Sequence, residues 1–192
     1  MKMTIEGLNT EGVLIFANVT RCKSYYADKA FDYNYPAGLS ELLQQGIIHI
    51  ITTDEAVEQV DFVFNKEEID TDIFEYHESY NYLKVDEGDE VRALSHADFT
   101  QMCHSYKGNL EEFVEHSLAL KNILNSGKNW TKESYFEYEV PLIELPVGNW
   151  KINVYSLRDE QVMSWMEFYI HLEQLDTVAI ENITLEPLEL YA

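Results

Sequence analysis

The sequence is poor in positive charge and in long apolar runs, and each shortage excludes a class of protein. Thirteen Lys and Arg residues face 35 Asp and Glu residues, so the formal net charge is −22. A surface this negative repels a phosphate backbone, and direct binding to nucleic acid is therefore not expected. No apolar run approaches the roughly 20 residues that a membrane span needs, so we expect no membrane partner either.

The N-terminus and the scarcity of cysteine bear on where the protein works. The first residues, MKMTIEGLNTEGV, lack the apolar stretch of a secretion signal, which leads us to expect a cytoplasmic protein. The two cysteines, Cys22 and Cys103, are then expected to be reduced thiols that pack as small hydrophobic residues. A structural disulfide between them is the alternative.

Sequence signatures of catalysis and of cofactors are also missing. There is no Gly-x-Ser-x-Gly, no phosphate-binding loop and no dinucleotide fingerprint, so we expect neither an enzyme nor a cofactor. His96, Cys103 and His104 are the densest group of metal-binding residue types, but no fourth ligand completes a zinc site. The acidic runs 70–78 and 85–90 lack EF-hand spacing, which leaves an irregular calcium loop as an alternative. A pair of catalytic carboxylates is a further alternative that only the fold can reveal.

Several segments alternate apolar and polar residues with a period of two, which is typical of half-buried β-strands. This pattern predicts six strands, a seventh with a bulge at the C-terminus, and one short strand within a looped acidic span, 67–90. The six are GVLIFANV (12–19), GIIHIITT (46–53), QVDFVFN (59–65), YFEYEVPL (135–142), NWKINVYSL (149–157) and VMSWMEFYIHL (162–172). The bulged strand is TVAIENITLEPLEL (177–190), and the short one is YNYLKV (80–85).

Two helices are expected between these groups of strands. Ser95 can cap a helix over 96–106, and Asn109 can cap a longer one over 110–124 that Gly127 is placed to end. We therefore predict a mostly β, α+β protein, an antiparallel β-sandwich with a central helical insertion. The predicted parts are an N-terminal β-module (1–94), a helical connection (95–127) and a C-terminal β-module (128–192), which can also form one compact domain.

An internal similarity suggests that the two β-modules are related. Residues 33–64 align with residues 138–170, since both pass from an aromatic residue and Pro, through Gly and a strand, to Asp-Glu and an acid-Phe pair. The matched positions are Pro36 and Pro141, Gly46 and Gly148, Asp54-Glu55 and Asp159-Glu160, and Asp61-Phe62 and Glu167-Phe168. An offset of about 105 residues fits a duplication, and it equally fits chance similarity between short hairpins.

The negative charge is concentrated in two stretches. From Asp54 to Glu90, fourteen acidic residues face Lys66 and Lys84, a net charge of −12, and no basic residue follows Arg158. Such a surface speeds encounter with a basic protein, and tyrosine is a favoured interface residue. We expect these residues to bind a basic protein partner: Asp54, Glu55, Glu58, Asp70, Asp72, Glu75, Tyr76, Glu78, Tyr80, Tyr82, Asp86 and Glu87. The alternative is that the acidity serves only solubility.

The segment PLIELPVGNWKINVYSLRDE (141–160), followed by WMEFYIHL (165–172), resembles a hairpin of small acidic bacterial β-sandwich proteins. The competence nuclease inhibitor family and some immunity proteins of bacterial toxin systems are similar in this respect. The resemblance covers residues 134–172 and implies a non-enzymatic inhibitor or immunity protein that neutralises a basic nuclease or toxin. It assigns no binding residue. A ligand- or carbohydrate-binding β-sandwich, with or without calcium, is the alternative function.

Overall fold

Two β-sheets and five α-helices make up the described part of the chain, an α+β protein. The computed structural model describes residues 2–8, 10, 12–53, 57–124, 129–158 and 166–190. The strands are β1 (Lys2–Leu8), β2 (Val13–Asn18), β3 (Ile48–Thr52), β4 (Val57–Val63), β5 (Phe74–His77), β6 (Tyr82–Val85), β7 (Val91–Ser95), β8 (Leu142–Ile143), β9 (Gly148–Leu157), β10 (Met166–Leu175) and β11 (Leu188–Glu189). The helices are α1 (Val19–Tyr26), α2 (Ser40–Gln44), α3 (His96–Ser105), α4 (Leu110–Leu124) and α5 (Lys132–Tyr138), with 3₁₀ turns η1 (Ala37–Leu39), η2 (Lys66–Glu68) and η4 (Ile180–Asn182).

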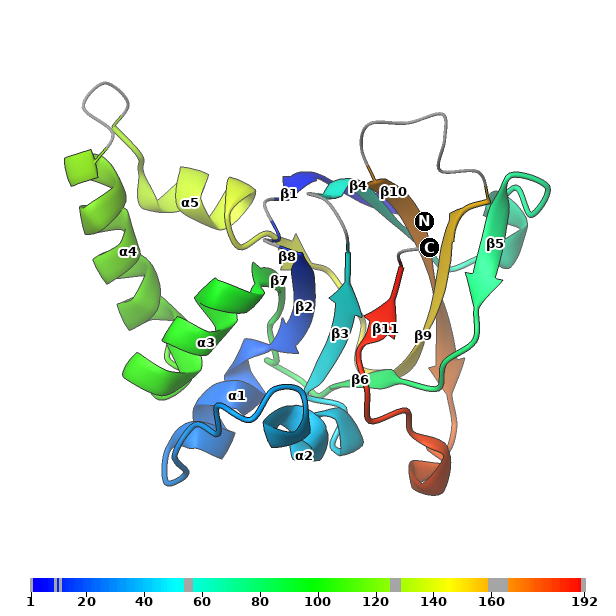
Figure 1. Cartoon of the computed structure of the whole chain (residues 1–192), viewed down its shortest axis with the longest axis horizontal. Coiled ribbons are helices and arrows are strands. Elements are labelled where there is room, and N and C mark those ends of the chain that lie inside the picture. The colour runs from blue at the N-terminus through cyan, green and yellow to red at the C-terminus, as the bar shows by residue number, and fades with distance from the viewer. Residues whose placement is uncertain are drawn as a thin grey trace.

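The strands form two mixed sheets that face each other (Figure 1). One sheet has six strands in the order β1-β4-β10-β9-β5, with β6 also paired to β9; the other has the order β11-β3-β2-β7-β8. The β4–β10 and β3–β11 pairs are parallel, whereas the remaining pairs are antiparallel. The predicted α+β class with two sheets is confirmed, but the sheets are mixed rather than wholly antiparallel.

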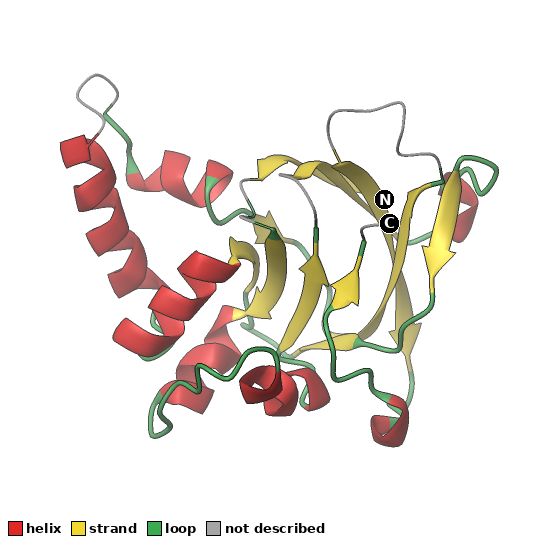
Figure 2. Ribbon diagram, in the orientation of Figure 1, coloured by secondary structure: helices red, strands yellow, loops and turns green. Residues whose placement is uncertain are grey.

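Alternation along β2 explains why the molecule has three layers. Leu14 and Phe16 point into the core between the sheets, where the Phe16 ring meets that of Phe62 at 5.4 Å. Ile15 and Ala17 point the other way and pack under the helices. Because β2 is apolar on both faces, it is covered on both faces, by the six-stranded sheet and by the helical layer (Figure 2). On the outer face of the six-stranded sheet, no described helix forms a layer, but Val63 and Tyr155 are buried there in a smaller cluster with Ile69 and Phe74.

Two predicted strands take other conformations. Residues 132–138 form α5, not a strand, because Thr131 and Ser134 make a reciprocal capping box that starts a helix. At the C-terminus, only Leu188–Glu189 is a strand; η4 and a loop replace the rest, and Thr184 bonds to Tyr80 instead of to a sheet. The helices predicted at 96–106 and 110–124 are confirmed as α3 and α4, whereas β1, β5, β7, α1 and α2 were not predicted.

The two predicted modules share their sheets. Strands β9 and β10 lie in the six-stranded sheet beside β4, and β8 and β11 flank the five-stranded sheet beside β7 and β3. The segments aligned as a repeat are also built differently, since β9 and β10 are neighbours in one sheet while β3 and β4 lie in different sheets. Neither Pro36 nor Pro141 ends a strand: Pro36 precedes η1 and Pro141 follows α5. Asp159-Glu160, Asp54-Glu55 and Gly127 lie outside the described residues.

Candidate protein-binding surface

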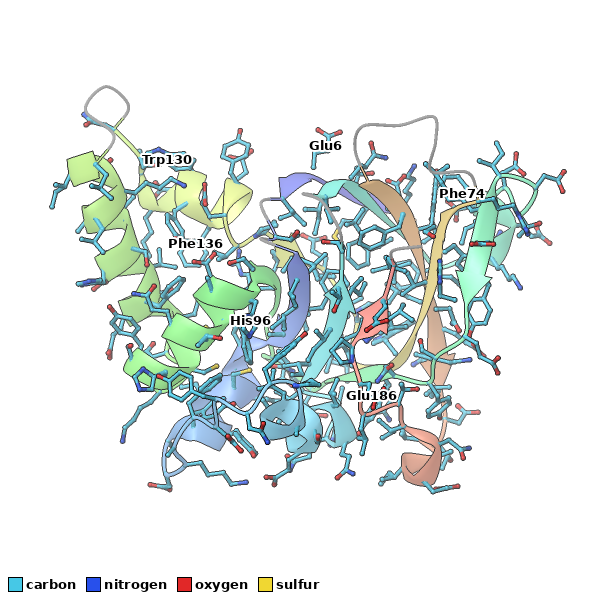
Figure 3. The ribbon with its side chains drawn as sticks, viewed as in Figure 1. Glu6, Phe74, His96, Trp130, Phe136 and Glu186 are labelled. Carbon is cyan, nitrogen blue, oxygen red and sulfur yellow. The ribbon has the colours of Figure 1, made fainter. Side chains whose placement is uncertain are left out.

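One edge of the six-stranded sheet carries many of the acidic residues predicted to bind a partner. Strand β5 pairs with the second half of β9, where Phe74 lies opposite Leu157, and β6 pairs with the first half, where Tyr82 lies opposite Lys151. Residues 70–85 therefore follow the length of β9 along a single edge, at which Figure 3 labels Phe74. The sequence folds this way because short strands, separated by polar residues, can each cover part of one long strand.

The C-terminal segment brings the second acidic stretch to the same edge. Tyr80 N–H donates to Thr184 Oγ1 at 3.0 Å, and Thr184 N–H donates to the carbonyl oxygen of Tyr80 at 2.9 Å. The Asn81 amide donates to the Thr184 carbonyl oxygen at 2.8 Å, and Ala179 N–H donates to the Tyr80 hydroxyl at 3.1 Å. These four bonds hold residues 179–184 against residues 80–81, about a hundred positions away in sequence.

We name this combined surface the acidic edge, and seven residues define it: Asp70, Asp72, Glu75, Glu78, Asp176, Glu181 and Glu186. Figure 3 labels Glu186 near the C-terminal segment. Six of the seven are exposed, and Glu75 is half-buried. Only Glu75 makes a salt bridge with a described residue, to Arg158 at 3.9 Å. Most of the charge of the acidic edge is therefore not neutralised by the described part of the chain.

Tyrosines and basic residues border the acidic edge. The Tyr76 side chain is 43% exposed, and its ring lies 5.2 Å from that of Tyr155 on β9. The Lys151 amine lies 5.7 Å from the centre of the Tyr80 ring, so this cation is held at an aromatic face. Tyr82 does not belong to this surface. It is buried, and its hydroxyl donates to the Gln44 carbonyl oxygen at 3.1 Å.

The other predicted residues lie apart from this surface or outside the description. Asp86 and Glu87 are exposed in the turn after β6, where Asp86 pairs with Arg21 of α1 and lies 3.9 Å from Lys84. Asp54 and Glu55, and the side chain of Glu58, lie outside the described residues. The prediction omitted Asp176, Glu181 and Glu186, although the lack of basic residues after Arg158 was a usable signal.

The outer face of the six-stranded sheet holds a second polar group, centred on Asp61. This carboxylate is 2% exposed and accepts hydrogen bonds from Thr4 Oγ1 at 2.6 Å and Gln59 Nε2 at 2.8 Å. Lys2 Nζ lies 2.9 Å away. Burial acts to raise the pKa of Asp61, but these hydrogen bonds outweigh it and lower the pKa. Since Asp61 is fully satisfied by its own strand neighbours, its role is structural.

The histidines and cysteines of α3 are engaged in packing. His96 lies 4.8 Å from the Tyr35 ring and His104 lies 5.1 Å from the Tyr33 ring, both ring to ring. Cys22 and Cys103 are buried free thiols, and burial raises the pKa of Cys103 further from its reactive range. Among the described residues, no group of three or more His, Cys, Asp and Glu side chains could hold a metal ion.

Within the described ranges, no helix is both long enough and apolar enough to cross a membrane. No family model, curated protein or solved structure matches the chain.

Proposed function

We propose that the protein is a non-enzymatic binding protein whose acidic edge binds a basic protein. The partner class we favour is a basic nuclease or toxin, which the protein would neutralise as an inhibitor or immunity protein. The observation that carries this proposal is the junction between Tyr80 and Thr184, which joins two acidic stretches into one surface. A surface whose like charges are mostly unpaired raises the rate of encounter with an oppositely charged partner.

The position of the acidic edge also supports the proposal. Glu75 lies on β5, which pairs with β9, and the other six residues lie in the turns and loops that flank β5, β6 and β10. The exposed ring of Tyr76 adds an aromatic group that can bury area at low cost in conformational entropy. Acidic residues around an aromatic anchor suit a partner that presents lysine and arginine around an apolar patch.

Purified basic ribonucleases and deoxyribonucleases are the direct test. We expect the intact protein to inhibit at least one of them, and the double variant Glu78→Lys/Glu181→Lys to inhibit about tenfold more weakly, since both changes place positive charge on the acidic edge. The matched control is Asp28→Lys/Glu115→Lys, which makes the same change in net charge at exposed positions after α1 and on α4. Equal losses in both variants, or no inhibition of any nuclease by the intact protein, would contradict the proposal.

The alternative of a calcium-dependent carbohydrate-binding protein has its own measurement. Isothermal titration with calcium, and then with an oligosaccharide panel in the presence of calcium, gives no heat of binding if the protein acts only through its acidic edge. A saturable calcium signal followed by sugar binding would favour the alternative.

A further inference from the structure

A groove with a volume of about 650 Å³ lies on the opposite side of the six-stranded sheet from the acidic edge. It runs between the edge strand β1 and the end of α5, close to the start of β8. Figure 3 labels Glu6 and Phe136, which come from its two sides. Its walls are formed by Thr4, Ile5, Glu6, Arg92, Phe136, Glu137, Tyr138, Pro141 and Leu142. None of these belongs to the acidic edge.

The main chain of β1 forms one wall of this groove. Side chains of successive residues in a strand point to opposite faces, so three consecutive residues can line one groove only through the edge of the strand. Thr4, Ile5 and Glu6 do so. Strand β1 is the last strand of its sheet, and its other edge pairs with β4. Among the described residues, no hydrogen bond outside the β1–β4 ladder uses the main-chain groups of Thr4–Glu6.

The opposite wall offers apolar surface. The Tyr138 side chain is 56% exposed and that of Leu142 is 40% exposed, although both are large and beside the groove. Leu142 begins β8, which is the last strand of the other sheet and only two residues long. Two sheet edges thus meet at the groove, and the longer one, β1, has the main-chain groups that a further strand would need.

The charged residues that line the groove indicate which kind of segment could bind there. Glu6 and Glu137 lie in its lining, and the Glu137 carboxylate beside Tyr138 raises the pKa of that phenol. Arg92 is the one cation of the lining, and its guanidinium is engaged by Glu90 and by the Val140 carbonyl oxygen at 2.9 Å. The charge left for an incoming segment is therefore negative. A second copy of this chain, with the same carboxylates and a net charge of −22, would be repelled.

We infer that this groove binds an extended, basic segment of another protein, which adds as a strand to the edge of β1. Its main chain bonds to Thr4–Glu6, alternate apolar side chains cover Tyr138 and Leu142, and its lysine or arginine side chains reach Glu6 and Glu137. Main-chain hydrogen bonds supply affinity in this mode, and the side-chain sites supply selectivity. The inference is independent of the acidic edge, because it concerns the other edge of the sheet.

The probe is a capped octapeptide of alternating lysine and valine, added to the intact protein labelled with ¹⁵N. We expect a dissociation constant below about 1 mM and amide shifts centred on Thr4–Glu6. A glutamate–valine peptide of the same length should bind at least about tenfold more weakly, because it meets like charges. No binding at about 1 mM, or shifts centred on the acidic edge, would overturn the inference.

Two N-methylated peptides test the main-chain bonding. In a strand, alternate residues direct their N–H groups to opposite edges. Methylation of all lysine amides, or of all valine amides, therefore blocks one edge at a time. We expect one methylated peptide to lose binding and the other to keep it. If both bind as the parent peptide does, the contact uses side chains alone and strand addition is wrong.

Matched variants test the location. Glu137→Lys/Leu142→Lys should weaken binding of the lysine–valine peptide at least about tenfold, since it removes one carboxylate and one apolar contact. Glu115→Lys/Ile123→Lys makes the same two kinds of change at exposed positions on α4, outside both the groove and the acidic edge, and should leave binding unchanged. Circular dichroism confirms that both variants are folded. Equal losses in the two variants would show that only net charge matters and would overturn the inference.

Discussion

His49 is a titratable side chain within the apolar core. It lies opposite Phe16 in the β2–β3 pair, so its imidazole points with Phe16 into the apolar space between the sheets. The His49 side chain is fully buried, and neither ring nitrogen has a hydrogen-bond partner among the described residues. Burial lowers the pKa of His49 from 6.5 to about 3, because a cation in this space loses its hydration.

The pKa of His49 predicts acid sensitivity that one substitution removes. In the unfolded chain His49 takes up a proton as the pH falls through 6.5, while in the folded protein it stays neutral down to about 3. Stability is therefore retained above pH 6.5 and lost as the pH falls, by about 1.4 kcal/mol per unit. Between pH 6.5 and 5 we expect His49→Leu to lose about 2 kcal/mol less than the native protein in urea unfolding. Parallel pH profiles for the two proteins would contradict this account.

The buried carboxylate of Asp61 is expected to stabilise the folded protein, so its removal should lower the free energy of unfolding. Replacing the buried Asp61 by Ala leaves Lys2 and Thr4 without their acceptor. We expect the free energy of unfolding to fall by about 2 kcal/mol. Thr4→Val removes one hydrogen bond only and should cost about 1 kcal/mol. Because the pKa of Asp61 is lowered, the Asp61 contribution is present above its unfolded pKa and disappears as the pH falls through the folded value. An Asp61→Ala variant as stable as the native protein would refute this role.

At the scale of elements, Gly46 connects α2 to both sheets. Its φ of +63° ends α2 in a Schellman motif, in which Gly46 N–H donates to Leu43 and Ile47 N–H donates to Leu42, both to carbonyl oxygens. The Gly46 carbonyl oxygen accepts from Lys84 N–H at 2.8 Å, and the Tyr82 ring lies against the glycine. A Cβ at position 46 would lie 2.4 Å from that ring. This packing explains why Tyr82 is buried rather than available to a partner.

A double-mutant cycle separates the two costs at Gly46. Gly46→Ala should destabilise the protein by at least about 2 kcal/mol, about 1 kcal/mol from the left-handed backbone and the rest from the Tyr82 ring. Tyr82→Ala removes the ring, so Gly46→Ala in that background should cost only about 1 kcal/mol. Chemical unfolding of all four proteins gives the coupling energy. Additive costs would show that the ring does not resist the new methyl group.

The elements also show what could be predicted from sequence. Helices α3 and α4 were predictable because Ser95 and the long apolar stripe of α4 are local signals. Helix α5 was mistaken for a strand because Phe136, Tyr138 and Val140 alternate with acids, and three alternating positions cannot outweigh the capping box at Thr131. The prediction of a C-terminal strand over 177–190 was wrong because the hydrogen bonds between Thr184 and Tyr80 are long-range contacts with no local signature in the sequence.

At the scale of the whole molecule, the candidate site was predictable in part. The acids 70–78 could be chosen because they are dense in sequence, and they do lie along one edge. The acids of 176–186 reach that edge only through the fold, and their place depends on the order of strands around β9. Charge counts along a chain therefore indicate that a surface is acidic, while the topology decides which acids share it.

The dependence of the association rate on ionic strength tests the acidic edge most directly. Under the proposed function, stopped-flow mixing with the best-inhibited nuclease from about 20 to 300 mM salt should show an association rate that falls at least about tenfold, because salt screens the acidic edge. Glu78→Lys/Glu181→Lys should flatten this dependence, and Asp28→Lys/Glu115→Lys should not. An association rate that is indifferent to salt, or equally altered in both variants, would contradict the account.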